Sequence, residues 1–161
     1  TNQTMASVLL ARLADFENLQ AAKSYSDPDQ SATVHPAKIP DQLQAFALHS
    51  IHQKLNNEKD IYCALGEWLS EPKPEVWFES QAKPKTIKGI RLDRRSQMLY
   101  DKDFVFLNGE SWRCKGKDAL VLRQLADQRQ LFKAELLIAT PEVLQLLSDW
   151  IEAGWAHSLP Q

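Results

Sequence analysis

The segment from Tyr25 to Pro40 contains three prolines and no glycine, and it lies between two helical patterns. Each proline fixes its own φ and pushes the preceding residue toward extended geometry, so this segment cannot form a helix. A flexible linker would be rich in glycine and serine, whereas this segment carries apolar and aromatic residues that can dock. We therefore expect an ordered strap that fixes how the flanking helices meet. Its characteristic residues are Tyr25, Asp27, Pro28, Asp29, His35 and Pro36.

Apolar residues at helical spacing predict three helices in the first 72 residues. The first runs to about Leu19, and the second has Asp41 as its N-cap. The third is capped by Asn57 and ended by Pro72. The pattern predicts one apolar face for the second helix, formed by Leu43, Phe46, Ala47, Ile51 and Leu55.

The second half of the chain changes to short β-like runs at 86–92, 98–100, 104–107 and 110–114. Asn108-Gly109 is typical of a two-residue hairpin turn, which needs positive φ at both positions. Two helices follow, one from Asp118 and one from Thr140 to Gly154. We predict an α+β fold. It consists of a helical region at 1–72, a proline-rich connector at 73–85 and a small winged-helix-like domain with an antiparallel hairpin sheet at 86–161.

The charges are segregated along the chain, although the net charge is only −2. Residues 1–82 have a net charge of −5 and residues 83–161 a net charge of +3. The positive charge is consistent with a basic interaction face for RNA or ribosomal material, and an ordinary solvated surface is the alternative interpretation. In contrast, the helix from Thr140 has three acidic and no basic residues, which argues against reading of the DNA groove by that helix. The predicted basic face consists of Lys88, Arg91, Arg94, Arg95, Arg113 and Lys115.

No catalytic, metal-binding or cofactor-binding constellation is visible in the sequence. The residues two positions after the four histidines are Ala37, Ile51, Lys54 and Leu159, so the His-x-Asp/Glu trace of non-haem iron oxygenases is missing. The glycine-rich phosphate motifs and the nucleophile elbow are missing too. Histidines 49 and 52 share a helical face, but no supporting ligand accompanies them. The two cysteines, Cys63 and Cys114, are interpreted as reduced structural residues.

Several segments resemble a known family in the same order. Tyr25–Asp29 and the following His35-Pro36-Ala37 and Ile39-Pro40 look like the linker after the catalytic barrel of bacterial cupin-like (JmjC-type) ribosomal oxygenases. The hairpin at Asn108–Glu110 and the ending Ile151–Trp155 agree with this family. Its members are protein arginine hydroxylases that act on a large-subunit ribosomal protein. The resemblance covers about residues 4–155.

The resemblance implies that a catalytic barrel binding Fe(II) and 2-oxoglutarate belongs to a parent protein. This chain resembles only the dimerisation region and the winged-helix-like domain that follow it, so no cofactor is expected here. The chain begins with Thr1 and enters a helical pattern almost at once, so we expect a fragment of a longer protein. The expected location is cytoplasmic, without membrane contact. The expected partners are a second copy of the chain and the parent's ribosomal protein substrate.

Three helices in about 70 residues make a thin core, which dimerisation would thicken. The candidate dimer interface consists of Leu9, Phe16, Phe46, Ile51 and Trp68. The main alternative is a stand-alone winged-helix protein that binds nucleic acid and functions without any oxygenase; its mark would be basic side chains on a groove-facing helix. A third interpretation is an interaction module whose basic face docks the substrate or the catalytic domain.

Overall fold

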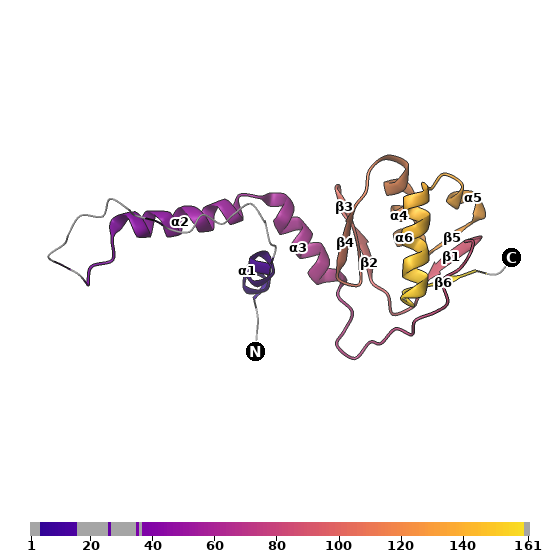
Figure 1. Cartoon of the computed structure of the whole chain (residues 1–161). Coiled ribbons are helices and arrows are strands. Elements are labelled where there is room, and N and C mark those ends of the chain that lie inside the picture. Colours follow the sequence, from indigo (N-terminus) through magenta and orange to yellow (C-terminus); the bar gives the residue numbers. More distant parts are fainter. Residues whose placement is uncertain (1–3, 16–25, 27–34, 36, 160–161) are drawn as a thin grey trace. The chain divides into compact units, whose positions relative to one another are not determined.

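The computed structural model describes residues 4–15, 26, 35 and 37–159. The chain forms two compact units, Thr1–Ala64 and Leu65–Gln161. The predicted connector, residues 73–85, therefore lies within the second unit. Figure 1 shows the order of the elements, which run from helices in the first unit to mixed helices and strands in the second.

The first unit contains helices α1 (Met5–Asp15) and α2 (Asp41–Leu55) and the start of α3 (Glu58–Ser70). The expected continuation of the first helix from residue 16 to Leu19 lies outside the described residues. The prediction of Asp41 as an N-cap was wrong by one position, because Pro40 is the cap and Asp41 is the first helical residue. An acidic residue there still favours the positive end of the helix dipole.

The last turns of α3 belong to the second unit and are bound to its β-hairpin. The Ser70 hydroxyl accepts a hydrogen bond from the Gly109 backbone N–H at 3.0 Å, and the Ser111 hydroxyl donates one to Glu67 at 2.6 Å. Gly66 lies against the Phe106 ring, so closely that a side chain at this position would overlap it. These contacts fix the end of α3 against the turn of the hairpin.

The second unit contains two three-stranded antiparallel sheets. One sheet has the order β2–β3–β4, with β2 at Met98–Tyr100, β3 at Phe104–Leu107 and β4 at Glu110–Arg113. Asn108 and Gly109 both have positive φ, and Leu107 pairs with Glu110, so the predicted two-residue hairpin is confirmed.

The second sheet joins segments that are far apart in sequence. Its central strand is β1 (Gly89–Leu92), flanked by β5 (Gln130–Phe132) and β6 (Ala156–Ser158). Arg91 pairs with Gln130 on one side and with His157 on the other. The strand predicted for 86–92 is therefore shorter, and the two flanking strands were not predicted.

Helices α4 (Gly116–Gln128) and α6 (Pro141–Glu152) complete this unit, together with the short α5 (Lys133–Leu136). Thr140 caps α6 by accepting a hydrogen bond from Val143, as predicted from the sequence. Gly154 has φ of +78° and ends the helix, also as predicted.

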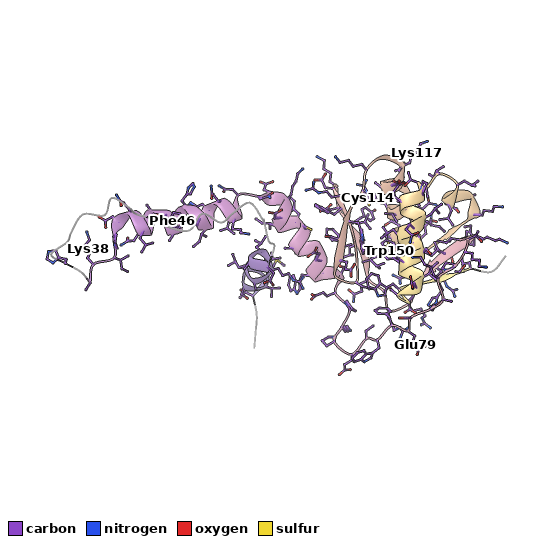
Figure 2. The ribbon with its side chains drawn as sticks, viewed as in Figure 1. Lys38, Phe46, Glu79, Cys114, Lys117 and Trp150 are labelled. Atoms are coloured by element: carbon purple, nitrogen blue, oxygen red, sulfur yellow. The ribbon has the colours of Figure 1, made fainter. Side chains whose placement is uncertain are left out.

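The core of the second unit lies between the two sheets and the helices, because α4 contacts strands β2 and β3 of one sheet and β5 of the other. Trp150 of α6 is buried in this unit (Figure 2) and meets Trp112 edge to face at 5.1 Å between ring centroids. The predicted α+β fold with a winged-helix-like domain is confirmed. The most deeply buried apolar side chains include Ile90, Val105, Phe106, Leu107, Val121, Leu122, Leu125, Leu131, Leu147, Trp150 and Ile151.

Candidate functional site

Asp93, a buried carboxylate directly after β1, holds an arginine and a histidine in place. Its Oδ1 accepts hydrogen bonds from the backbone N–H and Nε of Arg95, both at 2.9 Å. Its Oδ2 accepts from Nη2 of Arg95 at 3.2 Å and from Nε2 of His157 at 2.8 Å. Because an ionised carboxylate only accepts, Nε2 of His157 carries a proton. This network fixes the turn that follows β1.

The same network ties the proline-rich connector to the rest of the second unit. Arg95 Nη1 donates to the backbone carbonyl of Trp77 at 2.7 Å, and its guanidinium lies over the Phe78 ring at 5.4 Å from the centroid. Further along the connector, the side-chain amide nitrogen of Gln81 lies 2.8 Å from Nδ1 of His157. The backbone N–H of Gln81 donates to the backbone carbonyl of Glu152 at 2.8 Å. The connector is therefore held against the unit along much of its length.

The surroundings of Asp93 lower its pKa well below the ordinary value for aspartate. The side-chain hydrogen bonds from Arg95 are the main cause, and burial opposes them. The hydrogen bond from His157 lowers the pKa further. A lowered pKa in the folded state means that the ionised Asp93 stabilises the protein above about pH 4 and that this stabilisation is lost as the pH falls below that value.

We expect Asp93→Asn to lower the free energy of unfolding at neutral pH by about 1.5–3 kcal/mol, because an amide cannot accept all of these charge-assisted hydrogen bonds. The difference from the wild type should shrink as the pH falls below about 4, because the carboxylate of the unfolded wild type becomes protonated there while the folded one stays ionised to lower pH. Urea unfolding followed by circular dichroism across this range measures it. If the difference in free energy of unfolding between the two proteins stayed constant as the pH fell, the role given to Asp93 would be contradicted.

Three arginines and His157 surround a hollow of about 500 Å³ at this end of the sheet. Arg91 extends from β1, and Arg94 and Arg95 lie in the following turn. All three arginines are exposed, and Asp93 is the one carboxylate among the lining residues described. The hollow therefore carries an excess of positive charge. Lys88, also exposed, immediately precedes the strand.

The other two members of the predicted basic face, Arg113 and Lys115, line a different hollow of about 350 Å³. The acidic residues Asp118, Glu142 and Asp149 share this second hollow. Its lining also includes Cys114, whose thiol pKa is raised by burial. The six predicted basic residues thus separate into an unbalanced group near β1 and a group that faces carboxylates.

Four of the five candidate dimer residues lie on described helices. Leu9 on α1 and Phe46 on α2 are partly buried, and Ile51 on α2 is exposed. Trp68 is partly buried on the portion of α3 that belongs to the second unit. Phe16 lies outside the described residues. The single apolar face predicted for α2 is not observed, since Phe46 and Ile51 differ in exposure.

The predicted strap falls largely outside the described residues, which applies to Tyr25, Asp27, Pro28, Asp29 and Pro36. His35 is exposed, and its carbonyl accepts a hydrogen bond from the Lys38 N–H at 3.0 Å. The structure therefore does not test the strap as a unit.

Within residues 4–15, 26, 35 and 37–159, no three side chains of histidine, cysteine, aspartate or glutamate are grouped so that they could hold a metal ion. Histidines 49 and 52 are exposed on α2. Both cysteines are buried as thiols, Cys63 in α3 and Cys114 after β4. None of the helices described is both long enough and apolar enough to cross a membrane.

The hairpin β3–β4, the helices α4 and α6 and the small sheets define a winged-helix domain of the α+β class. The family model described as ROXA-like winged helix matches residues 53–157. The chain therefore belongs to the ROXA-like winged helix family.

Solved structures of the ribosomal oxygenase YcfD from Escherichia coli share the fold. One has a TM-score of 0.76 and 18% identity, over 99% of this chain and 48% of YcfD. A complex of YcfD with cobalt and 2-oxoglutarate has a TM-score of 0.75 and 19% identity, over 97% of this chain and 46% of YcfD. This chain thus spans less than half the length of the oxygenase. The resemblance to ribosomal oxygenases inferred from the sequence is confirmed. No curated protein sequence matches the chain.

Proposed function

We propose that this chain is the non-catalytic C-terminal portion of a 2-oxoglutarate-dependent ribosomal protein hydroxylase, in which it provides homodimerisation and an interaction module. Membership of the ROXA-like winged helix family and a fold shared with part of a ribosomal oxygenase support this assignment. The Fe(II) and 2-oxoglutarate of such an enzyme would belong to a catalytic domain that this chain does not resemble. The substrate of the parent would be a ribosomal protein.

The observation that carries the dimerisation role is helix α2. In the part of the chain that the structure describes, none of its fifteen residues is buried. Three of its large apolar side chains are among the exposed ones: Leu48 is 58% exposed, Ile51 56% and Leu55 37%. Residues spaced by three and four positions lie on one side of a helix, so these three form a continuous apolar stripe. We call it the α2 stripe.

The described residues of the first unit bury few apolar side chains that could compensate for this exposure. Among its described residues, the buried apolar side chains are Leu13, Cys63 and Ala64. Burial of more apolar surface against a partner stabilises a small unit. A second copy of the chain would bury the α2 stripes of both copies against each other, because a two-fold axis places the same surface against itself.

The dimerisation role is tested by mixing two versions of the chain, one with an affinity tag and one without, after denaturation and joint refolding. The affinity column is expected to retain the untagged chain in an amount close to that of the tagged chain. Retention no higher than on a column without the tagged copy would overturn the proposal.

We also expect the isolated chain to release no succinate from 2-oxoglutarate in the presence of Fe(II) and a reductant. The control is the same mixture without protein. Iron-dependent turnover by this polypeptide would show that the assignment as a non-catalytic portion is wrong.

The alternative of a stand-alone DNA-reading protein has less support. The helix α6 carries Glu142, Asp149 and Glu152 without a lysine or arginine, and an acidic helix repels the phosphates of a DNA groove. Two of these carboxylates are engaged by Lys83 of the connector.

A further inference from the structure

The hollow next to β1 is lined by three arginines, and one of them, Arg95, is paired with Asp93. Asp93 neutralises one guanidinium, that of Arg95, and holds it by both of its oxygens. Arg95 is further fixed by the Trp77 carbonyl and by the Phe78 ring. Arg95 is therefore a structural element of the hollow, although about half of its side chain (49%) remains exposed.

Arg91 and Arg94 differ from Arg95. Within residues 37–159, no carboxylate pairs with either side chain, and both are exposed at the edge of the hollow. Arg91 lies directly across from His157 in the sheet, where both ring nitrogens of the histidine are already engaged. Two unpaired guanidinium groups beside a concave surface attract anions, and phosphate groups match their donor geometry.

The most exposed aromatic side chain described belongs to the residue that Arg95 anchors. Trp77 is 79% exposed, although its backbone is fixed by a turn from Lys73 to Val76 on one side and by Arg95 on the other. A large ring that is open to solvent on a fixed backbone provides a stacking surface. Arg95 connects the backbone of Trp77 to the hollow, because its guanidinium both binds the Trp77 carbonyl and lines the cavity.

We propose that Trp77, Arg91 and Arg94 form a binding site for a single-stranded nucleic acid. One base of the strand stacks on Trp77, and the neighbouring phosphates bind the two arginines. Single-strand sites in general combine a positively charged groove with aromatic rings, because every base has a face that can stack. An acidic peptide would use the arginines but gain little from the ring. This proposal does not depend on dimerisation or on the parent enzyme.

The site is tested with the whole chain and a fluorescein-labelled single-stranded RNA of about 12 nucleotides, followed by fluorescence polarisation. We expect Trp77→Ala to weaken binding by about 5- to 100-fold and Trp77→Phe, which keeps a stacking ring, by less than about threefold. The double variant R91Q/R94Q should reduce the slope of log affinity against log salt by about 1.4, because each lost phosphate contact on a single strand accounts for about 0.7. Circular dichroism melting confirms that the variants fold.

The matched control removes two exposed lysines elsewhere in this unit, in K102Q/K117Q. Lys117 lies at the opposite end of the unit from Glu79 of the connector (Figure 2). This control should leave the salt slope unchanged. A single-stranded DNA of the same sequence identifies which sugar is preferred, and binding of either strand with the expected variant pattern supports the site.

Three outcomes would overturn the proposal. The first is absence of binding to both single strands at low salt. The second is a control variant that lowers the slope as much as R91Q/R94Q, which would indicate diffuse attraction. The third is binding that Trp77→Ala leaves unchanged while a glutamate-rich peptide competes for the arginines, which would indicate an acidic protein as the partner.

Discussion

Replacing Ile51 with aspartate is expected to raise the dissociation constant of the dimer by at least about 100-fold. Ile51 is the middle residue of the α2 stripe, so in a symmetric dimer two carboxylates would enter the apolar interface without a partner charge. The helix itself should persist, because the side chain is exposed within the chain and its replacement leaves no cavity. Sedimentation velocity over a range of concentrations measures the change.

Gln53→Asp is the matched control for this substitution. Gln53 is exposed on the same helix, but two positions from Ile51, which places it about 200° around the helix axis. It introduces the same charge in the same secondary structure and is expected to leave the dissociation constant within about threefold of the wild type. If both variants shift the equilibrium equally, the α2 stripe is not the interface.

Replacing Gly154 with alanine is expected to destabilise the winged-helix unit by about 2–5 kcal/mol. Gly154 has φ of +78°, and an added Cβ would overlap the backbone carbonyl of Glu79. The left-handed conformation costs a side chain roughly 1–2 kcal/mol, and the clash adds about 1–3 kcal/mol. The connector would have to move away from the end of α6, which breaks the hydrogen bond between Gln81 and Glu152.

Gly116→Ala separates the two contributions. Gly116 also has positive φ, +60°, but an added Cβ would have no neighbour within 4 Å. Its replacement should therefore cost only the conformational part, about 1–2 kcal/mol. Urea unfolding of both variants provides the comparison, and equal losses would mean that the connector does not press on Gly154.

The parts of the fold that were predicted correctly have strong local signals. Asn108-Gly109 specifies its turn through backbone conformation, and Thr140-Pro141 specifies a helix start through a cap and a fixed φ. Each signal acts within a few residues, so pairing with distant segments does not alter it. The winged-helix assignment followed from the order of these elements.

The missed elements depend on distant partners. Strands β5 and β6 are three residues long, and both exist because they pair with β1. No alternation of polar and apolar residues is readable over three positions. The same reason applies to the site, because Asp93 and His157 are 64 residues apart and no motif in the sequence links them.

The single apolar face predicted for α2 failed for a geometric reason. Phe46 and Ile51 are five residues apart, which corresponds to about 140° around the helix. The two residues therefore belong to different sides, and the structure buries Phe46 in part while leaving Ile51 exposed. Counting the exposed residues at spacings of three and four, as in the α2 stripe, identifies the side that is open to a partner.

The molar mass of the unmodified chain in solution tests the central claim most directly. Light scattering coupled to size exclusion at micromolar concentration is expected to give twice the chain mass of 18.4 kDa, because in the proposed dimer a second copy covers the exposed α2 stripe. A single species at 18.4 kDa that does not change with concentration would contradict the account.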